Sequence, residues 1–360
     1  MDADGTPTTQ QFLFPRRTTR AIIVTRKTGT NRLNPHTLVV ELSTELEGLC
    51  AALRKDYSSL SSRIRTLEHR VSCGCNGVTL RLHFPSFRQG KPTVSDLIQT
   101  IATFLPPFAL PRSEINAVTK LYGSIDVDAY NAKVTQLYQS AVTLFIRANR
   151  ATNRNGEAGE LLLYLLTEWI LAAPQILAKM SLKTNRDMPV HGADGIHIGY
   201  NSTNGALLIY WGESKLYADV NQAINAAIDS VCAASDPEKT QHELSLIQRN
   251  IDFAGLTESA KRALLRYLDP FDEASNHWEG IPTCLIGFDF SGFQKAAQAK
   301  NNAEATFQQL AEEHLKTLSP TITTKLTAAG LDDQTIELFF FPLPSVQRFR
   351  DVFQKHIGWK

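Results

Sequence analysis

The stretch DGIHIGYNSTNGALLIYWGESKLY, residues 194–217, decides the fold of this chain. Two apolar runs, DGIHIGY and ALLIYWGESK, are separated by NSTNG, in which the pair Asn204 and Gly205 favours a tight reversal. Apolar runs of this length with a turn between them are typical of two strands. The stretch therefore predicts an antiparallel hairpin.

The length of the turn sets which residues of the hairpin face each other. With a loop of four or five residues, Tyr200 or Asn201 pairs with Ala206. Counting back along both strands then places Asp194 opposite Glu213 or opposite the residue before it. Either register brings two carboxylates from different strands close together.

The acidic and basic residues of the second strand share one face. Side chains alternate along a strand, so Glu213 and Lys215 point to the same side. Because neighbouring carboxylates repel, a divalent cation that takes oxygen ligands from both Asp194 and Glu213 is the usual remedy. A third acid can come from Glu160, with Glu157 as the alternative, since both lie on one flank of the first turn of a predicted helix.

This set of residues suits phosphodiester hydrolysis. Carboxylates that hold Mg²⁺ or Mn²⁺ neutralise the charge of the phosphate and make a nearby water molecule acidic enough to react. A lysine beside them orients that water or stabilises the charge that develops on the phosphate. We therefore predict Glu160, Asp194, Glu213 and Lys215 as catalytic residues, the three acids also being metal ligands.

The E-x-K motif alone is weak, because a chain of this length contains roughly one by chance at average composition. Each residue also has a structural alternative. Asp194 can be a turn residue, and Glu213 with Lys215 an exposed ion pair of little energetic weight. Glu157 and Glu160 can stabilise a helix N-terminus. Only the combination of these residues favours a metal site over the structural alternatives.

The elements around the hairpin predict a mixed α/β (α+β) fold. Residues 156–173 form an apolar helix, a short strand lies within residues 176–183, and a helix follows the hairpin at residues 219–232. A charged helical insertion precedes the strand at residues 281–290. The order is helix, strand, strand, strand, helix, strand, after which two helices and a strand close the chain.

The N-terminal part is predicted to be mostly helical, with apolar residues at helical spacing from Pro35 to Arg70 and strand-like alternation in residues 78–84. We place a domain boundary near residue 140, which gives an N-terminal region (1–140) and a second domain (141–360).

Composition is that of a globular protein of 360 residues, with 43% apolar and 20% charged residues and a net charge of +1. The five cysteines are odd in number and lack a C-x-x-C pair, which favours reduced thiols, and no apolar stretch approaches the length that spans a bilayer. We expect a cytoplasmic protein without a membrane partner.

Basic residues gather in two places that can contact nucleic acid. Residues 5–40 contain no acid and form a basic arm, which either binds phosphates or an acidic partner or is a solvated terminus. Further candidates lie before the hairpin and in the helix after it, where solvent exposure is the alternative. The candidate DNA-binding residues are Arg16, Arg17, Arg20, Lys179, Lys183, Arg186 and Gln222.

Three blocks of the sequence, GEAGELLLYLL, AKMSLKTNRDMPVHGADGIHI and WGESKLY, resemble the HamA family, the effector subunit of the Hachiman anti-phage defence system. The resemblance extends from about residue 90 to the end. It implies a core similar to the PD-(D/E)xK restriction-endonuclease-like nucleases, in which Asp194 and Glu213 bind metal and Lys215 is the catalytic lysine. Ala193 stands where that pattern has a proline.

The resemblance also implies an Mg²⁺-dependent deoxyribonuclease that acts on DNA and is held in a complex with a HamB-like helicase. The alternative is a subunit that binds DNA or scaffolds a helicase without catalysis.

Overall fold

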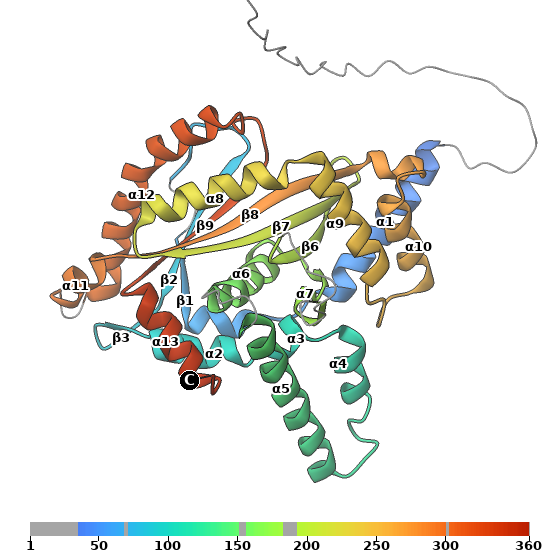
Figure 1. Ribbon diagram of the computed structural model, residues 1–360, viewed down its shortest axis with the longest axis horizontal. Coiled ribbons are helices and arrows are strands. Elements are labelled where there is room, and N and C mark those ends of the chain that lie inside the picture. The colour runs from blue at the N-terminus through green and yellow to red at the C-terminus, as the bar shows by residue number, and fades with distance from the viewer. Residues whose placement is uncertain (1–34, 68–70, 151–155, 183–192, 300–301, 360) are drawn as a thin grey trace, which may run out of the picture.

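The computed structural model describes residues 35–67, 71–150, 156–182, 193–299 and 302–359, and of residues 35–43, 148–150 and 157 the backbone only. The described residues form one sheet of seven strands in the order β1-β2-β9-β8-β7-β6-β5, and a two-stranded ribbon of β3 and β4 (Figure 1). The strands are β1 (Ile64–Leu67), β2 (Val78–Pro85), β3 (Phe87–Arg88), β4 (Lys91–Pro92), β5 (Gln175–Leu177), β6 (Gly195–Asn201), β7 (Ala206–Tyr217), β8 (Trp278–Asp289) and β9 (Ile336–Leu343).

The centre of the sheet is parallel and its edges are antiparallel. Strands β2, β9, β8 and β7 run in one direction, whereas β1, β6 and β5 pair antiparallel with their neighbours. The central strands are mostly apolar because both faces of the sheet are covered, and charged residues such as Glu213 and Lys215 on β7 and Arg81 on β2 are exceptions. On β9, for example, Phe340 points into the core on one face and Phe339 into the core on the other.

Helices cover both faces of the sheet (Figure 1). One face carries α1 (Pro35–Leu53), α8 (Val220–Ala234), α9 (Pro237–Asn250), α10 (Glu258–Leu268) and α12 (Ala303–Ala328). The other carries α2 (Val94–Ala102), α3 (Leu105–Ala109), α5 (Val127–Arg150), α6 (Glu157–Ile170) and α13 (Val346–His356). The remaining helices are α4 (Arg112–Thr119), α7 (Lys179–Leu182), α11 (Gly292–Ala297) and two 3₁₀ turns at Ser58–Ser62 and Glu273–Asn276. Within the described residues, none of these helices is both long and apolar enough to cross a bilayer.

The predicted hairpin is confirmed. Strands β6 and β7 pair antiparallel, and Asn201 pairs with Ala206, one of the two registers that the sequence allows. In the turn, Gly205 has a φ of 73°, and the Asn204 side chain accepts a hydrogen bond from the Ala206 N–H at 3.0 Å. The turn chemistry that the sequence displays therefore predicts the hairpin, and the folded chain selects one of the two registers.

The predicted order of elements is also present. Helix α6 is followed by β5, β6 and β7, then by α8, and β8 lies parallel to β7. Helices α9 and α10 form the predicted insertion between α8 and β8. Strands β1 and β2, which precede residue 140, belong to the same sheet, and the domain boundary at that residue stays a prediction.

The predicted helix from Pro35 to Arg70 is wrong beyond Leu53, where α1 ends. Residues 64–67 instead form β1 and pair with β2. Leu60 and Ile64 are buried, but they reach the core from a 3₁₀ turn and a strand. A four-residue spacing of apolar side chains is compatible with a helix, and only pairing with β2 selects the strand.

Candidate active site

Asp194 directly precedes β6, and the register of β6 and β7 continued by one residue places it opposite Glu213. The Asp194 N–H donates to the Gly212 carbonyl at 2.7 Å, and Gly195 pairs with Gly212 in the register of the two strands. The Asp194 carboxylate accepts a hydrogen bond from the Ser214 N–H at 3.0 Å. Backbone contacts on both sides of Glu213 therefore hold Asp194 beside it.

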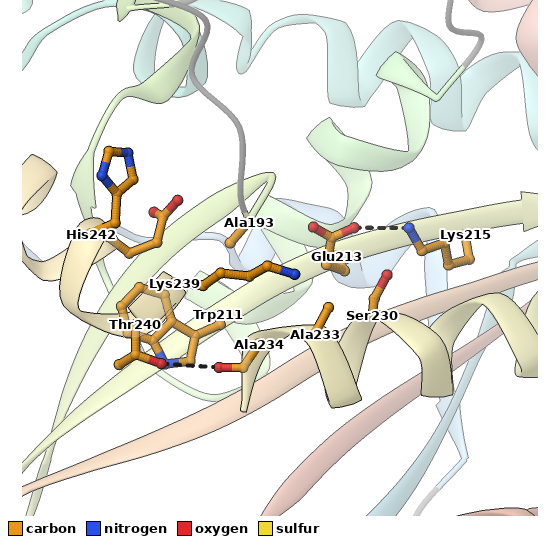
Figure 2. A pocket seen from close by; sticks show the side chains of 11 residues that line it. Ala193, Trp211, Glu213, Lys215, Ser230, Ala233, Ala234, Lys239, Thr240 and His242 are labelled. Carbon is orange, nitrogen blue, oxygen red and sulfur yellow. Dashed lines mark hydrogen bonds and ion pairs between the residues drawn. The ribbon is translucent and has the colours of Figure 1, made fainter. Parts of the chain in front are cut away.

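Glu213 and Lys215 form an ion pair on one face of β7. The Lys215 ammonium donates to the Glu213 carboxylate at 2.9 Å, as Figure 2 shows. Their side chains are only 21% and 20% exposed, so the pair is largely withdrawn from solvent. The structural alternative of an exposed pair does not describe these two residues.

The pKa of Glu213 is raised from 4.5 to about 7. Burial is the largest cause, the charge of Asp194 adds to it, and Lys215 opposes both. A carboxylate whose ionised form is disfavoured by burial and by a second acid gains most from a nearby cation. Raised carboxylate pKa values of this kind gather at functional sites.

The pKa of Lys215 is raised as well. Burial favours the neutral amine, but the charge and hydrogen bond of Glu213, together with the charge of Asp194, outweigh that effect. Lys215 is therefore an ammonium group at neutral pH, which is the form that the predicted role needs.

Helix α6 packs on the opposite face of β7 at very short range. A Cβ added to Gly159 would lie 2.2 Å from the Ser214 Oγ and 2.3 Å from the Leu216 Cδ1. A Cβ on Gly212 would lie 3.3 Å from the Leu163 Cδ2. Ser214 and Leu216 thus face α6, while Glu213 and Lys215 face α8 and α9. Glycine at position 159 lets the helix lie this close to the strand.

Glu160 lies on this helix, one residue after Gly159, and is buried. The structure brings Asp194, Glu213 and Lys215 together, whereas it places no third acid with them: the described residues contain no group of three acidic, histidine or cysteine side chains arranged to hold a metal ion. The role of Glu160 as a ligand stays a prediction. The side chain of Glu157 is outside the described part of the chain.

A cavity of about 450 Å³ opens beside the ion pair, between β7, the second half of α8 and the inserted helix α9 (Figure 2). Strand β7 supplies Trp211, Glu213 and Lys215 to its wall, and α9 supplies residues that the sequence analysis did not single out, namely Lys239, His242 and Glu243. The sequence identifies α9 as a charged helix. Nothing in its spacing, however, indicates that it covers β7.

The predicted DNA-binding residues fall in different environments. The Lys179 side chain is 1% exposed, with its ammonium 2.7 Å from Glu243 and 2.8 Å from the Ala193 carbonyl, so both partners would have to release it before it could contact DNA. Gln222 is exposed in the first turn of α8, whereas the cavity is lined by the second half of that helix. Outside the described residues lie Arg16, Arg17, Arg20, Lys183 and Arg186.

Sequence comparison supports the resemblance noted above. The profile of the HamA family matches residues 63–357. The chain belongs to the HamA family. The match begins earlier than the resemblance found by inspection, and it covers the first strand of the sheet as well as the hairpin. No curated protein sequence matches the chain.

HamA membership makes this a protein of Hachiman anti-phage defence. The family match spans the sheet, the inserted helices α9 and α10, and α13. All three site residues, Asp194, Glu213 and Lys215, lie within it. The basic arm before residue 40 lies outside it.

Proposed function

We propose that the chain is a metal-dependent deoxyribonuclease of the PD-(D/E)xK type, the effector of a Hachiman defence complex. One observation supports this most directly: hydrogen bonds to Gly212 and Ser214 hold Asp194 beside Glu213 at the end of the hairpin, and Lys215 is paired with Glu213 on one face of β7. The order of α6, three antiparallel strands, α8 and a parallel β8 also agrees with that nuclease core.

The residues present fit a divalent ion. Two carboxylates with several water or phosphate oxygens are an ordinary environment for Mg²⁺, which keeps much of its hydration shell in proteins. The raised pKa of Glu213 fits as well, because burial and the charge of Asp194 leave this carboxylate in need of a cation. Asp194 and Glu213 would hold Mg²⁺ or Mn²⁺, with Glu160 as the further acid that the family resemblance implies. When bound, the ion supplies positive charge at the phosphate and acidifies water.

The chain's own residues then have distinct roles. Asp194 and Glu213 fix the place of the reacting phosphate relative to β7. Lys215 donates hydrogen bonds either to the attacking water or to the phosphate oxygens that gain charge. Its ammonium is held by the Glu213 carboxylate in a largely buried setting, where such donors act most strongly.

The test is DNA cleavage by the purified chain in Mg²⁺, alone and together with the HamB-like helicase that the family resemblance implies as its partner. Asp194→Asn, Glu213→Gln and Lys215→Ala should each abolish cleavage while leaving the fold intact. The matched control is Lys261→Ala, because Lys261 also pairs with a glutamate, Glu258, at 2.5 Å, but on the surface of α10.

Cleavage by the parent and by the Lys261 control, and by none of the other three, supports the proposal. Equal behaviour of all variants with and without the helicase would instead favour a subunit that binds DNA or scaffolds the helicase without catalysis. Loss of cleavage in EDTA and its return on addition of Mg²⁺ or Mn²⁺ tests the metal requirement separately.

A further inference from the structure

Helix α9 forms the second wall of the candidate active site. The cavity between it and β7 has a volume of about 450 Å³, within the range of roughly 300 to 1,000 Å³ that is usual for ligand pockets. Glu213 and Lys215 line the cavity from β7, and Lys239 lines it from α9. A substrate that reaches the ion pair therefore also meets α9.

The start of α9 is held firmly in place. Its N-cap residue, Asp236, accepts hydrogen bonds from the backbone N–H groups of Glu238 and Lys239 at 2.9 and 3.4 Å. One turn on, the Thr240 hydroxyl contacts the Ala234 carbonyl at 3.1 Å, which ties α9 to the end of α8. The backbone of Lys239 is therefore fixed relative to α8, which itself packs on β7, before any ligand arrives.

A buried ion pair fastens the next turn of α9. The Glu243 carboxylate lies 2.7 Å from the Lys179 ammonium, and both side chains are more than nine-tenths buried. Glu243 also lines the cavity, but its second oxygen, Oε1, is buried and has no hydrogen-bond partner among the described residues. This carboxylate is compensated by Lys179, so it leaves the charge of Lys239 available to a ligand.

Lys239 differs from the other lysines of this site. Lys215 is paired with Glu213 and Lys179 with Glu243, but in the described part of the chain no carboxylate lies within ion-pair distance of Lys239. Its side chain reaches across the cavity with the ammonium toward Glu213 (Figure 2). A divalent ion held by Asp194 and Glu213 would cancel the charges of the two acids. Lys215 and Lys239 then present uncompensated positive charge from opposite walls.

We infer that Lys239 is a substrate-binding residue, contributed by the inserted helix, that holds a phosphate of a single unpaired nucleic-acid strand opposite Lys215; this inference rests on the proposed function. Two ammonium groups that face each other across a cavity suit a phosphodiester. The size of the cavity favours single-stranded over double-stranded nucleic acid. The cavity accommodates a nucleotide or two, whereas a duplex, whose major groove alone is about 12 Å wide, is too large to enter.

The test measures binding and cleavage separately on the full chain. Binding of a short fluorescein-labelled single-stranded DNA is measured in Ca²⁺, and again in EDTA, over a range of salt concentrations. Lys239→Ala should weaken binding about tenfold at low salt, since hydrogen bonds to charged groups contribute at least about 1.5 kcal/mol. The variant should also make the slope of the logarithm of the association constant against the logarithm of the salt concentration less steep by about 0.7, the value for one phosphate contact on a single strand.

Two further variants make the result specific. Lys239→Arg should restore most of the affinity, because it keeps the charge and the donors. The matched control is Lys133→Ala, which removes an exposed lysine from α5, and it should change neither the affinity nor the slope. The same DNA in duplex form should bind the parent more weakly than the single strand, and the difference should shrink in Lys239→Ala.

The outcomes separate this inference from the proposed function. If the parent cleaves DNA and Lys239→Ala matches it in affinity and salt slope, the inference is overturned and the nuclease proposal stands. If Lys239→Ala loses affinity and salt slope but no combination with the helicase cleaves DNA, the phosphate contact stands and the nuclease proposal fails. No detectable DNA binding by the parent overturns the inference directly.

Discussion

Replacing Gly159 by alanine should destabilise the fold, although alanine is the better helix former. Gly159 lies in the first turn of α6, and an added Cβ would come within 2.2 and 2.3 Å of side-chain atoms of Ser214 and Leu216. Ordinary contact begins at 3.4 Å, so each neighbour has to move by about 1 Å. Leu216 has little room to do so, because on its other side it packs against Gly287, where a Cβ would lie 2.9 Å away.

The magnitude follows from two opposing effects. Overpacking a buried contact costs about 1 to 3 kcal/mol, and the need to move two buried neighbours places Gly159 near the upper end of that range. The higher helix propensity of alanine opposes this cost and stabilises the helix by about 1 kcal/mol. The free energy of unfolding should therefore fall by about 2 kcal/mol. Cleavage activity should fall as well, because α6 has to shift against the strand that carries Glu213 and Lys215.

Gly48→Ala is the matched control, since Gly48 also lies within a helix but an added Cβ there meets no atom within 4 Å. It should raise the free energy of unfolding by up to about 1 kcal/mol. Equilibrium urea denaturation of the parent and both variants, followed by circular dichroism, measures the difference. If Gly159→Ala is stabilised as much as Gly48→Ala, the close packing of α6 on β7 described here is incorrect.

Three further predictions concern the charged residues. In EDTA, the free energy of unfolding of the parent relative to Glu213→Gln should fall by about 3 kcal/mol as the pH rises from 4.5 to 7. The reason is that the folded state keeps the Glu213 proton up to its raised pKa, whereas the unfolded chain releases it near pH 4.5. If urea denaturation shows the same pH dependence for both proteins, that carboxylate is not buried. Lys179→Met should lower the free energy of unfolding by about 3 to 5 kcal/mol, because it leaves the Glu243 carboxylate buried and unpaired. In a double-mutant cycle, the double variant Lys179→Met with Glu243→Leu should recover most of that loss. In a thermal-shift assay, Mg²⁺ at a hundred times its dissociation constant should stabilise the parent by about 2.7 kcal/mol and should stabilise the Asp194→Asn variant much less. Equal stabilisation of both proteins would show that Asp194 is not a metal ligand.

Much of the candidate site could be predicted from local sequence because a hairpin is a local structure. The turn at Asn204 and Gly205 limits the register to two possibilities, which place Asp194 opposite Glu213 or opposite Gly212, and the period of two along a strand places Glu213 and Lys215 on one face. The three residues lie within a stretch of fewer than 25 residues. No long-range packing is needed to bring them together.

Other assignments depend on contacts that the sequence does not display. Lysine is usually a surface residue, and Lys179 can be buried because its ammonium pairs with Glu243, far along the chain, and donates to the Ala193 carbonyl. The apolar residues from Leu60 onward are compatible with a helix, until pairing with β2 makes residues 64–67 a strand. In each case the decisive neighbour lies elsewhere in the chain, and its position depends on the packing of the whole sheet.

The sequence by itself therefore determined the hairpin, limited its register to two possibilities, and placed the acid and the lysine on a shared face, since these follow from turn chemistry and strand geometry within one short segment. The tertiary structure alone decided that α9 covers that face, that Lys239 reaches across it, and that Glu213 is buried enough for its pKa to rise to about 7. Those properties arise from burial and from the approach of charges on separate elements. They exist only once the helices have packed against the sheet.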